Sequence, residues 1–175
     1  MRTFLRTLIL LALVVWVGGL LFFGAVVAPV AFESLMPMFS DPAMGLQVAG
    51  TMVRDSLTHL HHIGLFCGAV LLLLYVVERI TRATRRSIGP PMLLTAVMMG
   101  LTAYSQFSVI PRMETLRLKA GAAMADFGST NPARLDFNRL HTVSTWLEGT
   151  VLLCGLGLIV LYARPEPTLG SSRGI

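Results

Sequence analysis

Four long runs of apolar residues dominate the hydrophobic pattern of the chain. They extend from Leu8 to Phe32, from Ser56 to Val77, from Ser87 to Pro111 and from Leu140 to Ala163, and Glu148 is the only Asp, Glu, Lys or Arg inside them. Each run has about 20 residues or more, the length that a helix needs to cross the hydrocarbon core of a bilayer. The pattern predicts an all-α integral membrane four-helix bundle, with a single transmembrane domain over residues 1–164 and a disordered tail over residues 165–175.

Two proline pairs mark where helices begin outside the apolar runs. Asp41-Pro42 and Asn131-Pro132 each combine a residue that caps a helix N-terminus with a proline suited to the first helical position. Helices are therefore expected to start at both places and to continue into the second and fourth spans. Because the residues after Pro111 also favour helix, we expect helices 3 and 4 to extend as a hairpin on the outer side of the membrane.

Composition and charge agree with a bilayer environment. Hydrophobic residues make up 54% of the chain and charged residues 13%, whereas soluble proteins have about 25% charged residues. The net charge of +5 comes from arginines at the ends of the apolar runs, a pattern that sets membrane orientation and does not indicate nucleic-acid binding. Arg2, Arg6, the arginines within 79–86 and Arg164 predict that both termini are cytoplasmic, in a multi-pass protein of the bacterial inner (plasma) membrane. The connection between helices 3 and 4 is also basic.

Small residues in the second span predict close helix packing. Gly64 and Gly68 form a GxxxG pair, which lets two helices approach closely where lipid removes the hydrophobic driving force. Cys67 and Cys154 each fall inside a span, and we expect two free thiols.

Polar and ionisable residues of three spans fall at one predicted depth. Counting about 20 residues of 1.5 Å each from the cytoplasmic side places this level just under the outer membrane surface. The residues near this level are His59, His62, Gln106, Arg112, His141, Ser144 and Glu148, and Glu33 lies about two turns above them.

Helical spacing distinguishes the histidines of the second span. His59 and His62 are three residues apart and share a face, which we expect to point inward, whereas His61 is expected to point away from the bundle. A carboxylate inside a bilayer is costly, so Glu148 should face the bundle and have a partner. The candidate partners are Arg112, His59 and His62.

The fourth span carries a family resemblance. Phe137, Leu140, His141 and Ser144, followed by Glu148, resemble the signature F-x-x-[LY]-H-x-x-S-x-x-x-N of the transmembrane protein 205-like family. Trp16-Val17-Gly18-Gly19 and Pro29 to Phe32 are similar to its W-x-G and P-x-x-F elements, and Gln106 to Pro111 to its amide and proline in helix 3. The resemblance implies a four-span membrane fold without an agreed activity. Glu148 replaces the usual Asn, which points to a group that titrates or binds a cation.

The polar level suggests a metal or small-cation site as the first functional hypothesis. Imidazole and carboxylate ligands together suit Zn, Cu, Ni or Fe. The candidate ligands are His59, His62, His141 and Glu148. The alternative at the same level is a purely structural hydrogen-bond network, to which Arg112, Gln106, Ser144 and Glu33 would contribute.

Three other functional classes remain open. A haem could lie between His141 and either His59 or His62, as in other four-helix membrane bundles. A structural or assembly subunit would dock onto membrane-protein partners, or onto a second copy, through the hairpin from Arg112 to Arg139. No phosphate loop, nucleophile elbow or HExxH pattern is present. The lack of these motifs argues against an enzyme without deciding the question, and an outer-leaflet transferase or hydrolase through His141 and Glu148 stays open.

Overall fold

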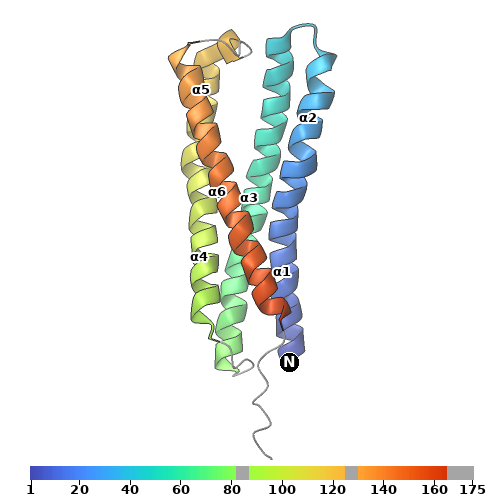
Figure 1. The fold of residues 1–175 in the computed structure, drawn as a ribbon, viewed down its shortest axis with the longest axis vertical. Coiled ribbons are helices and arrows are strands. Elements are labelled where there is room, and N and C mark those ends of the chain that lie inside the picture. The colour runs from blue at the N-terminus through green and yellow to red at the C-terminus, as the bar shows by residue number, and fades with distance from the viewer. Residues whose placement is uncertain (82–86, 125–129, 165–175) are drawn as a thin grey trace, which may run out of the picture.

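The described part of the chain folds into helices that run the length of an elongated bundle (Figure 1). The computed structural model describes residues 1–81, 87–124 and 130–164, so the predicted disordered tail lies outside the described residues. The α-helices are α1 (Arg2–Phe22), α2 (Ala28–Leu35), α3 (Pro42–Ile80), α4 (Gly89–Tyr104), α5 (Ile110–Ala120) and α6 (Pro132–Ala163). The π-helical segments are η1 (Phe23–Val27) and η3 (Ser105–Val109), and the 3-10 segments are η2 (Met36–Met38) and η4 (Gly121–Met124).

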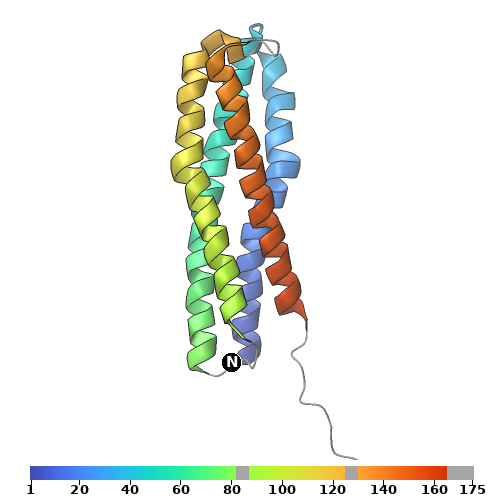
Figure 2. The ribbon, with the colours of Figure 1, turned by 60° about the vertical axis from the view of Figure 1, so that its left-hand side comes forward.

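Four continuous rods form the bundle, because η1 joins α1 to α2 and η3 joins α4 to α5. The rods α1 and α4 each pack against both α3 and α6. Further along, α2 packs on α3 and α5 packs on α6, so two helical pairs stand side by side in Figures 1 and 2. The N-terminus and the end of α6 lie at one end of the bundle, here called the terminal end. The opposite end, with η2 and η4, is called the hairpin end.

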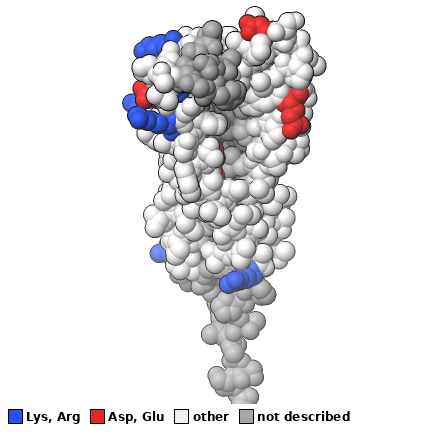
Figure 3. Space-filling view, turned by 45° about the horizontal axis from the view of Figure 1, so that its top comes forward, with Lys and Arg blue, Asp and Glu red and all other residues white. Residues whose placement is uncertain are grey.

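The prediction of four helices of membrane-spanning length is confirmed. All four rods are long and apolar enough to cross a bilayer, and the described residues contain no strand. Charged side chains gather toward the two ends in Figure 3, with an uncharged band between them. Large apolar side chains such as Phe66, Leu153 and Val160 are exposed on this band. The chain is therefore a multi-pass membrane protein in contact with lipid.

Both predicted helix starts are also confirmed. The side chain of Asp41 accepts a hydrogen bond from the Ala43 N–H at 2.9 Å, and Asn131 accepts one from the Ala133 N–H at 2.9 Å. Helix α5 ends where Gly121 adopts a positive φ of 53°, which favours glycine. Since α5 and α6 pack together on either side of this turn, they form the expected hairpin.

The GxxxG pair of α3 holds the indole of Trp16. Trp16 is 1% exposed, and a Cβ added at Gly64 would lie 2.3 Å from its Nε1. A Cβ at Gly68 would lie 2.5 Å from Met99 and 3.1 Å from the same indole. On α6, Gly155 makes similar room for Val17. Glycine at these positions lets the largest core side chain fit between α1 and α3. Cys67 and Cys154 are free thiols, as predicted.

A cation from α1 caps the C-terminus of α6 at the terminal end. Arg6 Nε donates to the Tyr162 carbonyl at 2.7 Å, and Nη2 donates to the carbonyls of Ala163 at 2.7 Å and Arg164 at 3.2 Å. The last carbonyls of a helix lack partners within the helix and carry its negative dipole end. Arg6 therefore joins the first and last rods both electrostatically and by hydrogen bonds.

Replacing Arg6 by Gln should lower the free energy of unfolding by about 1–2 kcal/mol, because charge-assisted bonds to the end of α6 are lost. Thermal unfolding of the purified protein in detergent measures the change. Arg139→Gln is the control, since the ion pair that Arg139 makes with Asp136 at 3.5 Å is highly exposed and should contribute little. Equal destabilisation by the two variants would contradict the capping role.

Candidate functional site

Prolines explain the two π-helical segments. Pro29 and Pro111 each stand two residues after such a segment, Phe23–Val27 and Ser105–Val109 respectively. After each segment, the next backbone N–H bonds to the carbonyl five residues earlier. Proline has no N–H and its ring clashes with the carbonyl four residues before it, so a widened turn relieves the crowding while the helix continues. Both rods stay continuous across a proline as a result.

The second π-helical segment, η3, supplies polar side chains to the bundle interior. Ser105 and Gln106 are consecutive, yet both are buried, at 0% and 9% exposure. π-helical turns occur often at functional sites because they present side chains that a regular helix would not. These two residues face α3 and α6 at the level where the apolar runs approach the hairpin end.

Four side chains from three rods form one hydrogen-bonded cluster, here called the His61–Glu148 cluster. His61 Nε2 lies 2.8 Å from Glu148 Oε1, and His61 Nδ1 lies 3.0 Å from Gln106 Oε1. Ser105 Oγ donates to the same Glu148 Oε1 at 3.0 Å. His61 is 1% exposed and the Glu148 side chain 19%. The cluster joins α3, η3 and α6 through polar contacts inside an otherwise apolar bundle.

The hydrogen bond between His61 and Glu148 allows its proton to sit on either side chain. If Nδ1 donates to the side-chain oxygen of Gln106, Nε2 either donates to a carboxylate or accepts from a protonated carboxyl group. Both arrangements hold the same number of protons and differ only in where one of them sits. Glu148 Oε2 is buried and has no hydrogen-bond partner among the described residues. An intramembrane carboxyl with an open oxygen is the kind of group that marks proton or ion pathways.

The face predicted for the α3 histidines is wrong. His61 points inward, whereas His59 and His62 are exposed, and His59 Nδ1 donates to the Asp55 carbonyl of its own helix at 2.8 Å. The buried face of α3 follows the glycines, and His61 precedes Gly64 by three residues on that face. Residues on the His59–His62 face, such as Phe66, point outward. The expectation that His59 or His62 would be the partner of Glu148 is therefore also wrong.

Other predicted residues are placed as follows. Gln106 belongs to the cluster, and Ser144 is buried one turn before Glu148 on α6. Arg112 is exposed and lies on α5 in a cavity against α6, so it is not the predicted partner of Glu148. His141 is exposed and stacks on Phe137, with ring centroids 6.2 Å apart. Glu33 is exposed on α2.

This geometry restricts the chemistry of the cluster. A Ser–His nucleophile pair needs a hydroxyl that donates to the imidazole, but Ser105 donates to Glu148 and both nitrogens of His61 are already engaged by other groups. A haem or metal ligand needs a ring nitrogen free to coordinate, which His61 lacks in this arrangement. Within the described residues, no three His, Cys, Asp or Glu side chains are arranged to hold a metal ion.

Buried hydroxyl groups continue from the cluster along α4 toward the terminal end. Thr102 and Thr95 lie on the same face as Ser105 and are 1% and 0% exposed. Thr102 Oγ1 has no partner among the described residues, and Thr95 donates to the Tyr75 hydroxyl at 3.4 Å. The ring of Tyr75 stacks on that of Tyr162, whose hydroxyl donates to the buried Glu78 at 3.4 Å. These buried hydroxyl groups therefore lie between two polar regions near opposite ends of the bundle.

A salt-bridge network ties α3 to α5 at the hairpin end. Glu114 accepts from Arg54 at 2.8 Å and from Arg117 at 2.9 Å, and Arg117 also donates to Thr51 at 2.8 Å. These contacts replace apolar packing where the two rods rise toward the aqueous surface. They hold α5 beside α3, and the cluster lies below them toward the apolar band.

Fold and site together define a class: a multi-pass α-helical membrane protein with a hydrogen-bonded His–carboxyl pair buried in its bundle. The chain belongs to a family described as "Domain of unknown function (DUF4149)", whose model matches residues 11–122. The matched part includes His61, Ser105 and Gln106, while Glu148 comes from the helix that follows it. Comparison with curated proteins and with solved structures found no match.

Proposed function

We propose that the protein handles a small cation, the proton, at the His61–Glu148 cluster. The observation that carries the proposal is the hydrogen bond between His61 and Glu148 at 2.8 Å, beside a buried carboxyl oxygen of Glu148 that has no partner among the described residues. Burying a carboxyl group costs free energy unless it is paired. A site that retains this cost, with one oxygen open, is suited to taking up and releasing a proton.

The hydroxyl face of α4 supports movement of the proton beyond the pair. Ser105 bonds directly to Glu148, and Thr102 and Thr95 follow on the same buried face. Hydroxyl groups both donate and accept, so each passes a proton without holding a charge. In the proposal, water molecules bridge the spaces between these groups when the path is active. The buried Glu78 is the acceptor toward the terminal end.

The family resemblance and the distribution of arginines support the role of Glu148 and the orientation of the chain in the membrane. The fourth-span signature resembles the transmembrane protein 205-like family, with Glu148 in place of its usual Asn. A glutamate in place of this asparagine adds a proton-binding group to a hydrogen-bond network that would otherwise be neutral. We place both termini in the cytoplasm and the cluster near the outer face of a bacterial inner membrane, because the arginines flank the terminal end of the spans.

Proton flux in reconstituted vesicles tests the proposal. Proteoliposomes that contain a pH-sensitive dye should dissipate an imposed pH gradient faster than empty vesicles, and Glu148→Gln should reduce this rate to that of empty vesicles. The amide keeps the shape of the side chain but cannot exchange a proton. Infrared difference spectra between acidic and basic buffer should also show a carboxyl band in the wild type that Glu148→Gln removes.

Glu33→Gln is the matched control, since it removes an exposed carboxylate of the hairpin end. This variant should keep both the wild-type flux and the infrared band. Wild-type flux equal to that of empty vesicles would contradict proton conduction. Loss of flux in both variants would show that charge, and not the cluster, controls the rate.

Metal binding by His59, His62, His141 and Glu148 stays a prediction that this arrangement does not favour. His59, His62 and His141 are exposed, whereas Glu148 bonds to His61 inside the bundle. A common metal would need α3 to rotate relative to α6. Elemental analysis of the purified wild type and of the double variant His59→Ala/His62→Ala distinguishes metal binding from proton handling. A bound metal that is present in the wild type and lost in the variant would favour metal binding.

A further inference from the structure

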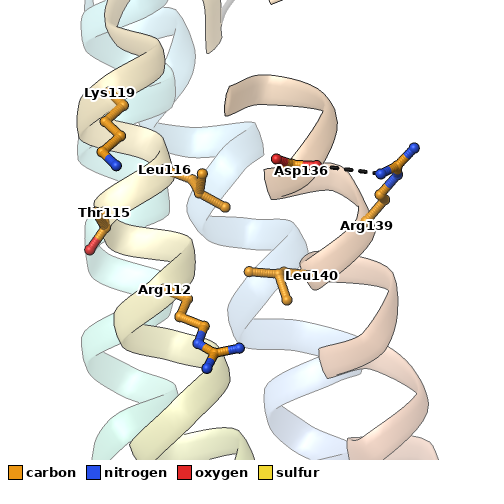
Figure 4. A pocket seen from close by; sticks show the side chains of 7 residues that line it. All are labelled: Arg112, Thr115, Leu116, Lys119, Asp136, Arg139 and Leu140. Atoms are coloured by element: carbon orange, nitrogen blue, oxygen red, sulfur yellow. Dashed lines mark hydrogen bonds and ion pairs between the residues drawn. The ribbon is translucent and has the colours of Figure 1, made fainter. Parts of the chain in front are cut away.

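A cavity of about 470 Å³ lies between α5 and α6 at the hairpin end. Arg112, Leu116 and Lys119 line it from α5, and Asp136, Arg139 and Leu140 line it from α6. Figure 4 shows Arg112 and Leu116 reaching from α5 toward α6, with Leu140 and Asp136 reaching back from the other side. The cavity is separate from the His61–Glu148 cluster and shares no residue with it.

The charge of the lining is positive. Three cations and one carboxylate contribute to it, and the carboxylate of Asp136 is already paired with Arg139 at 3.5 Å. Arg112 and Lys119 have no ion pair or side-chain hydrogen bond recorded among the described residues. Arg112 and Lys119 lie about two turns apart on α5, and no carboxylate in the described part of the chain neutralises either of them. They therefore create a positive potential that favours the binding of an anion.

The position of the cavity indicates what kind of anion fits. Arg112 directly follows the apolar run that ends at Pro111, which places it at the boundary between hydrocarbon and headgroups. Leu116 and Leu140 give the cavity an apolar wall beside the cations. A guanidinium group matches the oxygens of a phosphate through two parallel hydrogen bonds, and a lysine adds a point charge.

We propose that this cavity binds a phosphate group, supplied by the headgroup of an anionic lipid whose glycerol and upper acyl carbons contact Leu116 and Leu140. The alternative source of the same chemistry is free inorganic phosphate, which would use the cations without the leucines. Lipid binding here would hold α5 against α6 at the base of the hairpin. The inference does not rest on proton handling, because none of the cavity residues belongs to the cluster.

Titration of the delipidated full-length protein in a non-ionic detergent tests this site. The probes are dioctanoyl phosphatidylglycerol and inorganic phosphate, and native mass spectrometry or calorimetry measures binding. Wild-type protein should bind the lipid, and Arg112→Gln should weaken this binding about tenfold, since one charge-assisted contact is lost. Arg112→Gln/Lys119→Gln should abolish measurable binding.

Arg79→Gln is the matched control, because it removes one exposed arginine at the terminal end of α3. It should bind the lipid as the wild type does. Binding of inorganic phosphate alone, with the same dependence on Arg112, would support the anion site and assign it to free phosphate. The proposal is overturned if neither probe binds the wild type, or if Arg112→Gln and Arg79→Gln have equal effects. Arg112 and Arg79 are both exposed side chains, so neither substitution should disturb folding, and a change in binding can be attributed to the lost charge.

Discussion

Replacing Gly64 by alanine is expected to destabilise the bundle by about 2–3 kcal/mol, because overpacking of a buried contact forces side chains or helices apart. The added Cβ would lie 2.3 Å from Trp16 Nε1 and 2.8 Å from its Cδ1. The indole cannot move aside, since Trp16 is 1% exposed between α1 and α3. Thermal or denaturant unfolding in detergent, followed by fluorescence in a Trp146→Phe background, reports on Trp16 directly.

Gly100→Ala is the control for this substitution. Gly100 lies in the middle of α4 with nothing within 4 Å of an added Cβ, so alanine should leave stability unchanged or raise it slightly through its helix propensity. Combining Gly64→Ala with Trp16→Leu should cost less than the sum of the two single changes, because the smaller side chain removes the clash. Equal stability of Gly64→Ala and Gly100→Ala would refute the tight contact between α1 and α3.

The spans and helix starts could be predicted because each depends on local sequence. Apolar length alone determines which segments can cross a bilayer, and Asp41-Pro42 and Asn131-Pro132 carry their own capping groups. The π-helical segments could not be read from the apolar pattern, which continues through both of them. The signals that could have located them were Pro29 and Pro111, each inside an apolar run that must remain helical.

The depth of the site was predictable, but its composition was not. Counting residues along each helix placed Gln106, Glu148 and the α3 histidines at one level, and the hydrogen bonds between their rods agree with that level. Choosing which histidine points inward required knowing which face of α3 packs. Gly64 and Gly68 mark that face, and His61 belongs to it by helical spacing. Weighting the glycines above the paired histidines would have given the correct residue.

Ser105 was missed because no spacing rule connects it to α6. Its contact with Glu148 arises from the packing of η3 against α6, which brings two residues 43 positions apart in the sequence within 3.0 Å. Arg112 is one of the three candidate partners that the sequence offers for Glu148. The structure instead pairs Glu148 with His61, whereas Arg112 lies about two turns beyond Ser105 and faces the cavity between α5 and α6.

Replacing His61 by leucine should destabilise the protein by about 3 kcal/mol, since breaking a buried polar pair leaves its partner unsatisfied. Glu148 would keep only the hydroxyl of Ser105, and Gln106 would lose its donor. Glu148→Leu should have a similar cost for the same reason. The double variant should cost less than the sum of the single changes, because both members of the pair are then apolar. Unfolding in mixed micelles measures the stability of the wild type, the two single variants and the double variant, which together form a double-mutant cycle.

The neighbouring histidine provides the matched control cycle. His62 is one residue away on α3 but exposed, so His62→Leu and Glu148→Leu should be additive within about 0.5 kcal/mol. A coupling free energy for His61 that is no larger than that for His62 would contradict the hydrogen-bonded pair of His61 and Glu148. Coupling confined to His61 would instead show that α3 and α6 are held together through one imidazole and one carboxyl group. Any event that moved the proton between them would then change how these two helices interact.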